Sequence, residues 1–278
     1  METMEMPAPP PVGESVRPVP AELPISQAQT QSRLQGGLVT QLARDPQAVH
    51  EAQRLRWQVF AGELGAKLHS PKEGLDQDGL DAHCEHLLVR ETQTGEVVAC
   101  TRLLFDYRAV EAGGFYSQSE FDMKSILLLP GRILEVGRTC VRPDRRAGGA
   151  ISVLWSGIAK IISSCGVDYV IGCASIPMTD GGAQAHAVMR RLRAGHMTPE
   201  NLRVQPRRSL PEPQGELPAE AILPPLLRTY MRLGARIGGE AFWDPDFRCA
   251  DAFILLEPRR MNPRYARHFF VPVRTEAI

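Results

Sequence analysis

The sequence contains few lysines, no C-x-x-C cysteine pair and no long apolar run. Lysine occurs only at positions 67, 72, 124 and 160, and all other basic side chains apart from histidine are arginines. Because this bias can reflect genome composition, the presence of an arginine is not by itself evidence of a functional role at that position. The formal net charge is +0, which argues against a general nucleic-acid binder.

The six cysteines are scattered at positions 84, 100, 140, 165, 173 and 249. Several lie in apolar segments, which is typical of reduced, partly buried thiols rather than of a disulfide framework. The N-terminal segment has neither the basic nor the apolar region of a signal peptide. No apolar run approaches the ~20 residues that a membrane-spanning helix needs. We therefore expect a cytoplasmic protein, with any membrane contact being peripheral.

The chain is long enough for one large domain or two small ones, and 43% of its 278 residues are hydrophobic. Residues 1–30 carry seven prolines and few large apolar side chains, so we predict a disordered tail. A second proline-rich stretch, at about 198–225, lies between regular elements and is typical of a long functional loop or lid. Residues 31–278 are expected to form a single domain.

Strand and helix patterns follow one another through this domain. Asp45 and Pro46 are typical of a helix start, and a 3.6-residue apolar period follows them. The segment 167–175 is continuously apolar, as expected for a strand covered on both faces. We expect an α+β fold with a mixed central sheet. Strands are predicted at 38–44, 86–91, 96–105, 132–141, 167–175 and 251–257, and helices from 46, at 150–166, 180–195 and 224–239.

A basic, glycine-bearing loop joins the strand 132–141 to the helix 150–166. It reads Arg145-Arg146-Ala147-Gly148-Gly149-Ala150. Free N–H groups at a helix start bind phosphate well, glycine lets the backbone approach closely, and arginine adds charge. Spacing alone leaves two interpretations open, a phosphate site and a basic surface turn.

Two charged residues, Glu135 and Arg138, lie in the apolar strand before this loop. Regular alternation would place them on opposite faces, whereas a β-bulge near Gly137 would bring them to one side. A structural ion pair or a solvent-exposed edge remains the alternative. Since Arg56, Arg102 and several aspartates also lie in or near predicted strands, and single buried charges are costly, we expect one polar site that pairs them.

Several features have structural interpretations. His83 and His86 lack a matching second pair of ligands, so no metal site is expected. Trp155 is expected in the core. The helix 224–239 has an apolar face at Leu226, Leu227, Tyr230 and Leu233 that suits the core, although partial membrane-surface contact is an alternative.

The loop fits the pattern [Q/R]-x-x-G-x-[G/A] through Arg145, Gly148 and Ala150. It thereby resembles the phosphate-binding motif of the GCN5-related N-acetyltransferase (GNAT) superfamily. The resemblance implies that the strands 132–141 and 167–175 splay apart to admit a pantetheine arm, whose phosphate the loop holds.

Four short sequence patterns are similar to those of acyl-homoserine lactone synthases: R-x-x-V-F, D-x-x-D, R-L-L and E-x-x-R. Their residues here are Arg56/Phe60, Asp78/Asp81, Arg102 and Glu135/Arg138. The chain more closely resembles the L-ornithine N-alpha-acyltransferases of ornithine-lipid synthesis, from about Gln53 to Phe270. The shared blocks include "FAGELGA", "FYSQSEFDM", "EVGRTCVRPDRR", "LWSGIAK", "PPLLRTYMRLGARI", "DPDFRCADAFILL" and "RYARHFF". The family's usual "GCASFPGTD" reads "GCASIPMTD" here, with Ile176 and Met178.

The resemblance implies that residues 31–278 are an acyltransferase domain that moves a 3-hydroxyacyl chain from acyl carrier protein to the α-amine of L-ornithine, giving lyso-ornithine lipid. No cofactor is implied beyond the phosphopantetheine thioester of the donor. Glu135 is the expected base, with Arg138 beside it in the catalytic site. The donor is expected at Thr139, Cys140, Val141, Arg145, Arg146, Gly148, Gly149 and Ala150, and the acceptor at Arg56, Asp78, Asp81 and Arg102.

Alternatives remain open at this stage. Asp78 and Asp81 could simply cap a turn, and Arg138 rather than Arg102 could hold the acceptor carboxylate. The donor could be an acyl-CoA and the acceptor another amino acid, and a non-catalytic acyl-carrier-binding regulator is a further alternative. Arg190, Arg191 and Arg193 form either a solvated helix face or a docking surface for acidic acyl carrier protein.

Overall fold

The computed structural model describes residues 37–261. The predicted tail at 1–30 and the "RYARHFF" block lie outside this part. Within it, no helix is both long and apolar enough to cross a membrane. An eight-stranded sheet runs in the order β1-β2-β3-β5-β6-β10-β8, with β9 also paired to β10. The strands are β1 (Leu38–Leu42), β2 (Glu85–Glu91), β3 (Val97–Phe105), β5 (Ile133–Val141), β6 (Tyr169–Pro177), β8 (Arg236–Ile237), β9 (Phe242–Asp244) and β10 (Cys249–Leu256).

The sheet is mixed, as the sequence predicts. All of its pairs are antiparallel except the central pair β5–β6, which is parallel. The helix α6 (Ala150–Cys165) makes the crossover that a parallel pair requires. It begins after Gly149 and ends at Gly166, and both glycines have the left-handed conformation, with φ of 79° and 61°.

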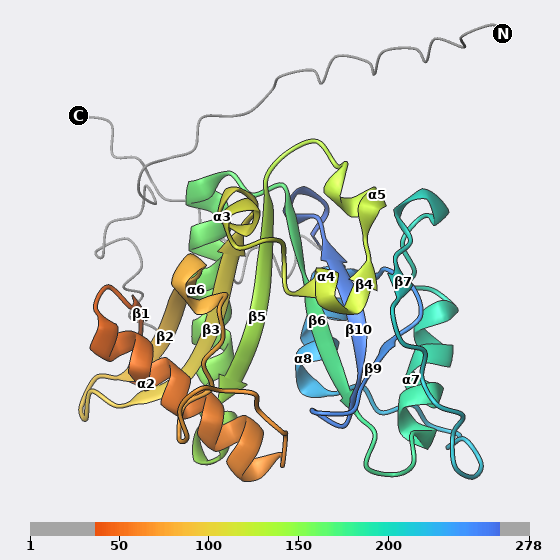
Figure 1. Cartoon of the computed structure of the whole chain (residues 1–278), viewed down its shortest axis with the longest axis horizontal. Coiled ribbons are helices and arrows are strands. Elements are labelled where there is room, and N and C mark those ends of the chain that lie inside the picture. The colour runs from red at the N-terminus through yellow and green to blue at the C-terminus, as the bar shows by residue number, and fades with distance from the viewer. Residues whose placement is uncertain (1–36, 262–278) are drawn as a thin grey trace, which may run out of the picture.

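The helices lie on both faces of the sheet (Figure 1). One core cluster joins the sheet to α6, α7 (Ala183–Arg193) and α8 (Pro225–Leu233). On the other face, α2 (Pro46–Trp57) covers β2, β3 and β5. The N-cap of α2 is Asp45, whose Oδ1 accepts from the Ala48 N–H at 2.9 Å, as predicted. Short elements complete that face: α3 (Asp106–Glu111), α4 (Ser117–Glu120), α5 (Lys124–Leu127), β4 (Phe121–Asp122) and β7 (Gln205–Pro206).

The central strands β5 and β6 pair at one end and separate at the other (Figure 1). Their register covers only Ile133–Glu135 against Tyr169–Ile171, although both strands continue for six more residues. Gly172 lies at the point of separation, where a Cβ would come within 2.4 Å of the Val136 carbonyl oxygen. The close approach there and the divergence beyond it produce the splayed pair that the sequence resemblance implies.

A β-bulge lies in β5 directly after Gly137. Arg102 of β3 is opposite Gly137 and Cys100 is opposite Cys140, so Arg138 and Thr139 together face one residue of β3. Arg138 has a φ of 50°, which is uncommon for a side chain with a Cβ. The sequence predicts a bulge between Glu135 and Arg138, near Gly137, whereas the bulged residues are Arg138 and Thr139, directly after that position.

The proline-rich stretch 198–225 is held against the domain along its length. It contains a 3₁₀ turn at Glu200–Leu202 and the strand β7, which pairs with β4. The Gln214 N–H donates to Gly181 O, and Arg191 donates to Ala221 O. In α8, Leu227, Tyr230 and Leu233 are buried, and the Tyr230 ring meets Trp155 edge to face at 5.1 Å. The core interpretation of this helix and of Trp155 is confirmed.

Candidate active site

A cavity of about 310 Å³ lies where β5 and β6 part. Its walls come from both parted strands, from β9 and β10, and from the start of α8. Both polar and apolar side chains line it. The polar lining includes Arg102, Tyr116, Glu135, Arg138, Thr139, Cys173, Ser175, Asp244, Cys249 and Asp251, and the apolar lining includes Phe60, Leu64, Leu104, Pro177, Pro224, Leu226 and Phe247.

Glu135 lies at the point of separation and is only 4% exposed. Its Oε2 accepts from the Tyr116 N–H at 2.7 Å, and its Oε1 accepts from both the N–H and the hydroxyl of Ser117, at 2.8 and 2.6 Å. Burial raises the pKa of this carboxyl group, and the hydrogen bonds from Ser117 and Tyr116 oppose that rise. The result is a fixed carboxylate in the cavity wall with a strengthened affinity for a proton.

Arg138 faces the same cavity as Glu135, because the bulge turns it to that side. Its guanidinium lies over the rings of Tyr116 and Phe247, at 4.8 and 5.1 Å from their centroids. Its Nε is 3.3 Å from Asp76 Oδ2, and its Nη2 is 3.7 Å from Asp78 Oδ2. Neither Glu135 nor Arg138 faces solvent at an edge of the sheet. The two residues also do not form an ion pair, because the carboxylate of Glu135 accepts its hydrogen bonds from Tyr116 and from Ser117 of α4.

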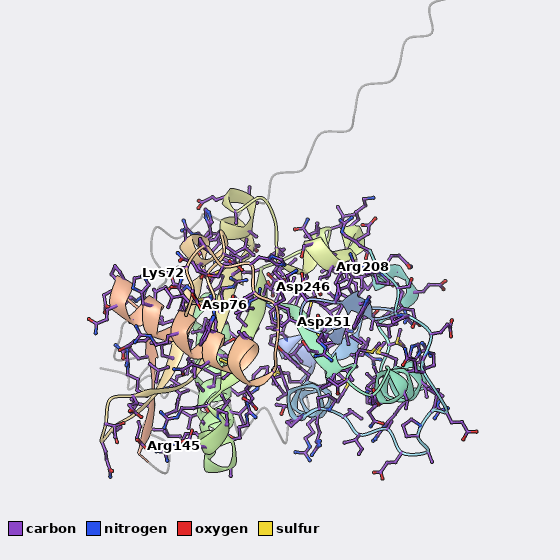
Figure 2. All side chains as sticks on the ribbon, turned by 60° about the horizontal axis from the view of Figure 1, so that its bottom comes forward. Lys72, Asp76, Arg145, Arg208, Asp246 and Asp251 are labelled. Atoms are coloured by element: carbon purple, nitrogen blue, oxygen red, sulfur yellow. The ribbon has the colours of Figure 1, made fainter. Side chains whose placement is uncertain are left out.

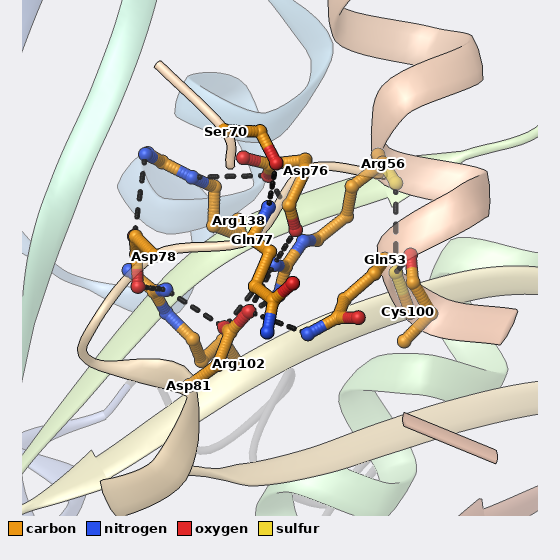
Figure 3. Close-up of polar contacts among 12 residues, drawn as sticks. Gln53, Arg56, Ser70, Asp76, Gln77, Asp78, Asp81, Cys100, Arg102 and Arg138 are labelled. Carbon is orange, nitrogen blue, oxygen red and sulfur yellow. Dashed lines mark hydrogen bonds and ion pairs between the residues drawn. The ribbon is translucent and has the colours of Figure 1, made fainter. Parts of the chain in front are cut away.

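Below the cavity, three arginines and three aspartates form one buried network (Figure 3). Arg56 is 1% exposed and binds Asp81 through both terminal nitrogens, with Nη2 to Oδ2 at 2.8 Å. Its Nε lies 2.9 Å from Asp76 Oδ2. Arg102 joins Asp78 at 2.6 Å and Asp81 at 2.9 Å. The arginines lower the pKa values of both Asp78 and Asp81 against the effect of burial, so both are ionised and paired.

This pairing differs from the acceptor-binding role expected for the set. Arg56 and Asp81 lie beneath the cavity without lining it, and each has its charge satisfied within the network. Asp78 borders a smaller adjoining pocket but is paired with Arg102. Both carboxylates are thus paired with arginines, and direct contact of either with the acceptor stays a prediction. Arg102 and Arg138 do reach the main cavity, and Asp76, which sequence reasoning did not single out, links Arg56 to Arg138.

The loop before α6 forms a 3₁₀ turn at Pro143–Gly148 followed by Gly149. No side chain caps the helix that starts at Ala150, so its first N–H groups are available to an anion. Arg146 makes two 2.6 Å contacts to Glu63, and Arg145 lies 3.0 Å from Glu91. All four side chains are partly exposed, and an anion at the helix start would compete with these carboxylates for the arginines.

The three residues expected to meet the donor arm, Thr139 to Val141, face different ways. Thr139 lines the cavity. Cys140 faces the other way, with its Sγ 3.6 Å from Cys100 Sγ beneath α2. Because Arg142 N donates to Val98 O across the antiparallel pair, the alternating pattern directs the Val141 N–H away from β3, toward the parted side. Any contribution of Cys140 to the donor site would come from its backbone, since its side chain is packed in the core.

A second acidic group lies on the far side of the cavity, on α4, β9 and β10. It consists of Glu120, Asp244 and Asp251, and Cys249 lies among them. Asp251 Oδ1 accepts from the Ser175 hydroxyl at 2.6 Å, and Asp244 Oδ1 accepts from the Asp246 and Phe247 N–H groups. Asp251 lies near the centre of the molecule in Figure 2, whereas Arg145 lies at its periphery.

Sequence reasoning missed this group. The available signal was the same as for Glu135, a carboxylate in an apolar strand: Asp251 opens "DAFILLE". Side-chain atoms of Asp244, Cys249 and Asp251 lie within 4.8 Å of one another. His83 and His86 do not belong to this group, and His86 instead hydrogen-bonds the Asp81 carbonyl oxygen.

The arginines of α7 are engaged within the domain. Arg190 donates to Pro218 O, Arg191 to Ala221 O, and Arg193 makes two contacts with Glu240. All three side chains are exposed, as the interpretation as a solvated helix face predicts, and they also hold the proline-rich loop and a neighbouring turn. Their use as a docking surface stays a prediction.

Comparison with known proteins supports the fold and places the sequence among characterised relatives. The acetyltransferase (GNAT) domain matches residues 55–156. The L-ornithine N(alpha)-acyltransferase of Rhizobium meliloti is 35% identical over 250 residues, covering 84% of this chain and 84% of that protein. The enzyme of the same name from Rhodobacter capsulatus is 34% identical over 242 residues, covering 82% and 93%. Among solved structures, the AHL synthase LasI is similar with 15% identity and a TM-score of 0.48, covering 87% of this chain and 98% of that one.

Proposed function

The chain belongs to the L-ornithine N(alpha)-acyltransferase family and is an N-acyltransferase. We propose that it forms an amide between the α-amine of L-ornithine and a 3-hydroxyacyl group. The acyl group is delivered as a thioester of acyl carrier protein. The product would be lyso-ornithine lipid. The observation that carries the proposal is the cavity between the parted strands with Glu135 in its wall.

The donor arm enters between β5 and β6 in this proposal. Strand separation leaves backbone groups of both strands without a neighbour, and the Val141 N–H is one that points toward the gap. Such an N–H can polarise a thioester carbonyl or anchor the amide groups of pantetheine. The phosphate would then lie at the uncapped start of α6, near Gly148, Gly149 and Ala150, with Arg145 and Arg146 turning from their carboxylate partners toward it.

The acyl chain would occupy the apolar part of the cavity. Pro177 and Thr179 of the "GCASIPMTD" block and Pro224 and Leu226 at the start of α8 line that part. The proline-rich stretch ends at this wall, so it shapes the cavity rather than merely covering it. Met178 is buried in the core next to these residues. The family's usual block has glycine at this position, so the methionine side chain can affect which acyl chain the cavity prefers.

The acceptor would present its carboxylate to Arg138 and its α-amine to Glu135. Arg138 is held by two aromatic rings and two aspartates, so its guanidinium is preorganised at the cavity wall. Arg56 and Asp81 act indirectly, because they fix Asp76 and Arg102 from below. In this proposal Arg56, Asp78 and Asp81 do not contact the acceptor directly. They position the side chains of Arg102 and Arg138 through the network, in which three aspartates balance the charge of three arginines.

The reaction needs a neutral amine and a leaving thiol. Glu135 takes a proton from the α-ammonium, directly or through water, and the amine nitrogen attacks the thioester carbonyl carbon. The C–N bond forms, and the tetrahedral intermediate collapses with cleavage of the C–S bond. Of the two protons that the nitrogen loses, one ends on the pantetheine sulfur and the other passes to solvent. A carboxylate with a raised pKa suits both transfers, since its proton affinity lies closer to neutral pH.

The test pairs each donor with each acceptor and identifies products by mass spectrometry. We expect amide formation from 3-hydroxyacyl-acyl carrier protein and L-ornithine. Glu135→Gln, which keeps the acceptor oxygen for Ser117, should retain the fold and lower kcat by about 10²–10⁴-fold. Wild-type turnover in that variant would exclude Glu135 as the base. Acylation from acyl-CoA but never from acyl carrier protein would exclude the proposed donor.

A further inference from the structure

The two acidic groups beside the cavity differ in their charge balance. The network below the cavity has three aspartates matched by three arginines. Within residues 37–261, by contrast, Glu120, Asp244 and Asp251 make no ion pair with any arginine or lysine. Arg138 interacts electrostatically with Asp251 but makes its close contacts with Asp76 and Asp78.

Glu120 is the most exceptional member of the unbalanced group. It is 97% buried, being 3% exposed, and neither of its carboxylate oxygens has a hydrogen-bond partner in the described part of the chain. Burial and the neighbouring Asp251 raise its pKa to about 8, against the effect of the nearby Cys173 thiol and Tyr116 hydroxyl. In the free protein Glu120 is therefore mostly protonated at neutral pH, and a cation placed beside it would favour its ionised form.

This unbalanced group adjoins the same cavity as Glu135 and Arg138. Asp244 and Asp251 line it directly. Glu120 lies at the end of α4, whose first residue, Ser117, holds Glu135 and also contacts Cys173 of β6 at 3.4 Å. Glu135, Cys173, Asp244 and Asp251 line the cavity. Ser117 and Glu120 lie directly behind this lining, where Ser117 contacts Glu135 and Cys173 and Glu120 interacts with Cys173 and Asp251.

From this arrangement we propose that Glu120, Asp244 and Asp251 bind the side-chain ammonium group of the acceptor, and so select a basic amino acid and fix which of its two amines reacts. The proposal rests on the function proposed above and adds to it the subsite for the second amine. With the distal ammonium among these carboxylates and the acceptor carboxylate on Arg138, the α-amine is the group left beside Glu135.

An organic ammonium fits this subsite better than a metal ion does. Only Asp244, Cys249 and Asp251 lie close enough together to ligate a metal ion, and Glu120, whose carboxyl oxygens are without a hydrogen-bond partner in the described residues, is not among them. Asp251 accepts from the Ser175 hydroxyl through Oδ1 and from the Cys249 thiol through Oδ2, at 2.6 and 3.4 Å, and Asp244 Oδ1 accepts from backbone N–H groups. An ammonium group donates three hydrogen bonds and needs no further ligands, and a carboxylate oxygen that already accepts one hydrogen bond can accept another.

The test compares L-ornithine with L-norvaline, which has the same three-carbon side chain without the distal amine. Binding of each to the full-length protein is measured by calorimetry, and turnover is measured with the thioester donor. We expect ornithine to bind wild-type protein at least about 10- to 100-fold more tightly than norvaline. Glu120→Gln and Asp251→Asn should remove most of that difference while leaving norvaline binding nearly unchanged.

Asp246→Asn is the matched control. Asp246 lies in the same turn as Asp244 but pairs with the exposed His69, so its variant should keep the ornithine preference. Thermal unfolding of each variant checks the fold. The proposal would be overturned if both Glu120→Gln and Asp251→Asn kept the preference for ornithine over norvaline. So would loss of ornithine binding on EDTA treatment with recovery on adding Zn²⁺ or Mg²⁺, because the cation would then be a metal.

The two proposals fail in different ways. If ornithine binds in a manner that depends on Glu120 and Asp251 but is never acylated, the subsite stands and the proposed reaction does not. If ornithine is acylated by all variants with unchanged preference over norvaline, the proposed reaction stands and the subsite does not.

Discussion

Ser117 donates two hydrogen bonds to the same oxygen of Glu135, one from its hydroxyl at 2.6 Å and one from its backbone N–H at 2.8 Å. Its hydroxyl oxygen also lies 3.4 Å from the Cys173 sulfur on the other parted strand. One small residue of a four-residue helix thus connects both walls of the cavity at the point where the strands separate. A fixed carboxylate there is what the proposed proton transfer requires.

Ser117→Ala should lower kcat and move the acidic limb of the pH–rate profile to higher pH. The Ser117 hydroxyl lowers the pKa of Glu135, so its removal raises that pKa, and the base becomes deprotonated only at higher pH. The loss of one hydrogen bond to a charged group corresponds to about 10-fold or more in kcat. Ser119→Ala, on the exposed side of the same helix, is the control. An unshifted profile in Ser117→Ala would argue against Glu135 as the titrating base.

Gly149→Ala should weaken donor binding. Gly149 has a φ of 79° and precedes the first residue of α6, so a side chain there strains the turn by about 1 kcal/mol and disturbs the N–H groups offered to the donor phosphate. We expect a several-fold rise in KM for the thioester and little change in KM for ornithine. Gly95→Ala introduces the same kind of strain, at a φ of 74° with open space around it. Equal effects of the two substitutions on donor KM would contradict a phosphate site at this loop.

Asp81→Asn should destabilise the fold strongly. It leaves Arg56 and Arg102 without part of their counter-charge in a buried network, and breaking such a pair costs about 3–5 kcal/mol, equivalent to a decrease in Tm of roughly 10 °C. Calorimetric or spectroscopic melting measures this. Asp122→Asn, at an exposed pair with Lys124, should leave Tm nearly unchanged.

The same network predicts sensitivity to acid. The pKa of Asp81 lies below its ordinary value of 3.8 because Arg56 and Arg102 outweigh burial. Its contribution to stability is therefore fully present above pH 3.8 and is lost as the pH falls toward the lower folded-state pKa. Wild-type Tm should decrease in that range, and the decrease should be smaller in Asp81→Asn. Parallel Tm curves for the two proteins would contradict the assignment.

Glu120→Gln should stabilise the ligand-free protein above neutral pH. The pKa of Glu120 is raised to about 8, so ionisation of this carboxyl group destabilises the folded state as the pH rises from its ordinary value of 4.5 toward 8. Glutamine removes that charge at nearly the same volume. We expect a higher Tm than wild type at pH 8 and a smaller difference at pH 5. A lower Tm at both pH values would indicate that a partner satisfies Glu120 in the free protein.

The pattern of residues along the chain determined the fold class and much of the catalytic centre. Local signals predicted the secondary structure, and the structure has the expected elements at these positions. The signals are the period-2 and period-3.6 segments, Asp45-Pro46 and the two glycines around α6. Glu135 and the glycine loop could be found because each departs from its surroundings: a charge in an apolar strand, and a bare backbone before a helix. The resemblance to a known family added the reaction.

Only the tertiary structure decided which charges remain available to a substrate. The sequence groups Asp78 and Asp81 with the acceptor, but folding brings them against Arg56 and Arg102, where their charges cancel. It also brings Glu120 from α4 beside Asp244 and Asp251 of β9 and β10, from segments more than 120 residues apart, and leaves them unbalanced. Charge balance depends on distances between side chains that no local pattern encodes. For this reason the sequence grouped Asp78 and Asp81 with the acceptor and did not single out Glu120, Asp244 or Asp251.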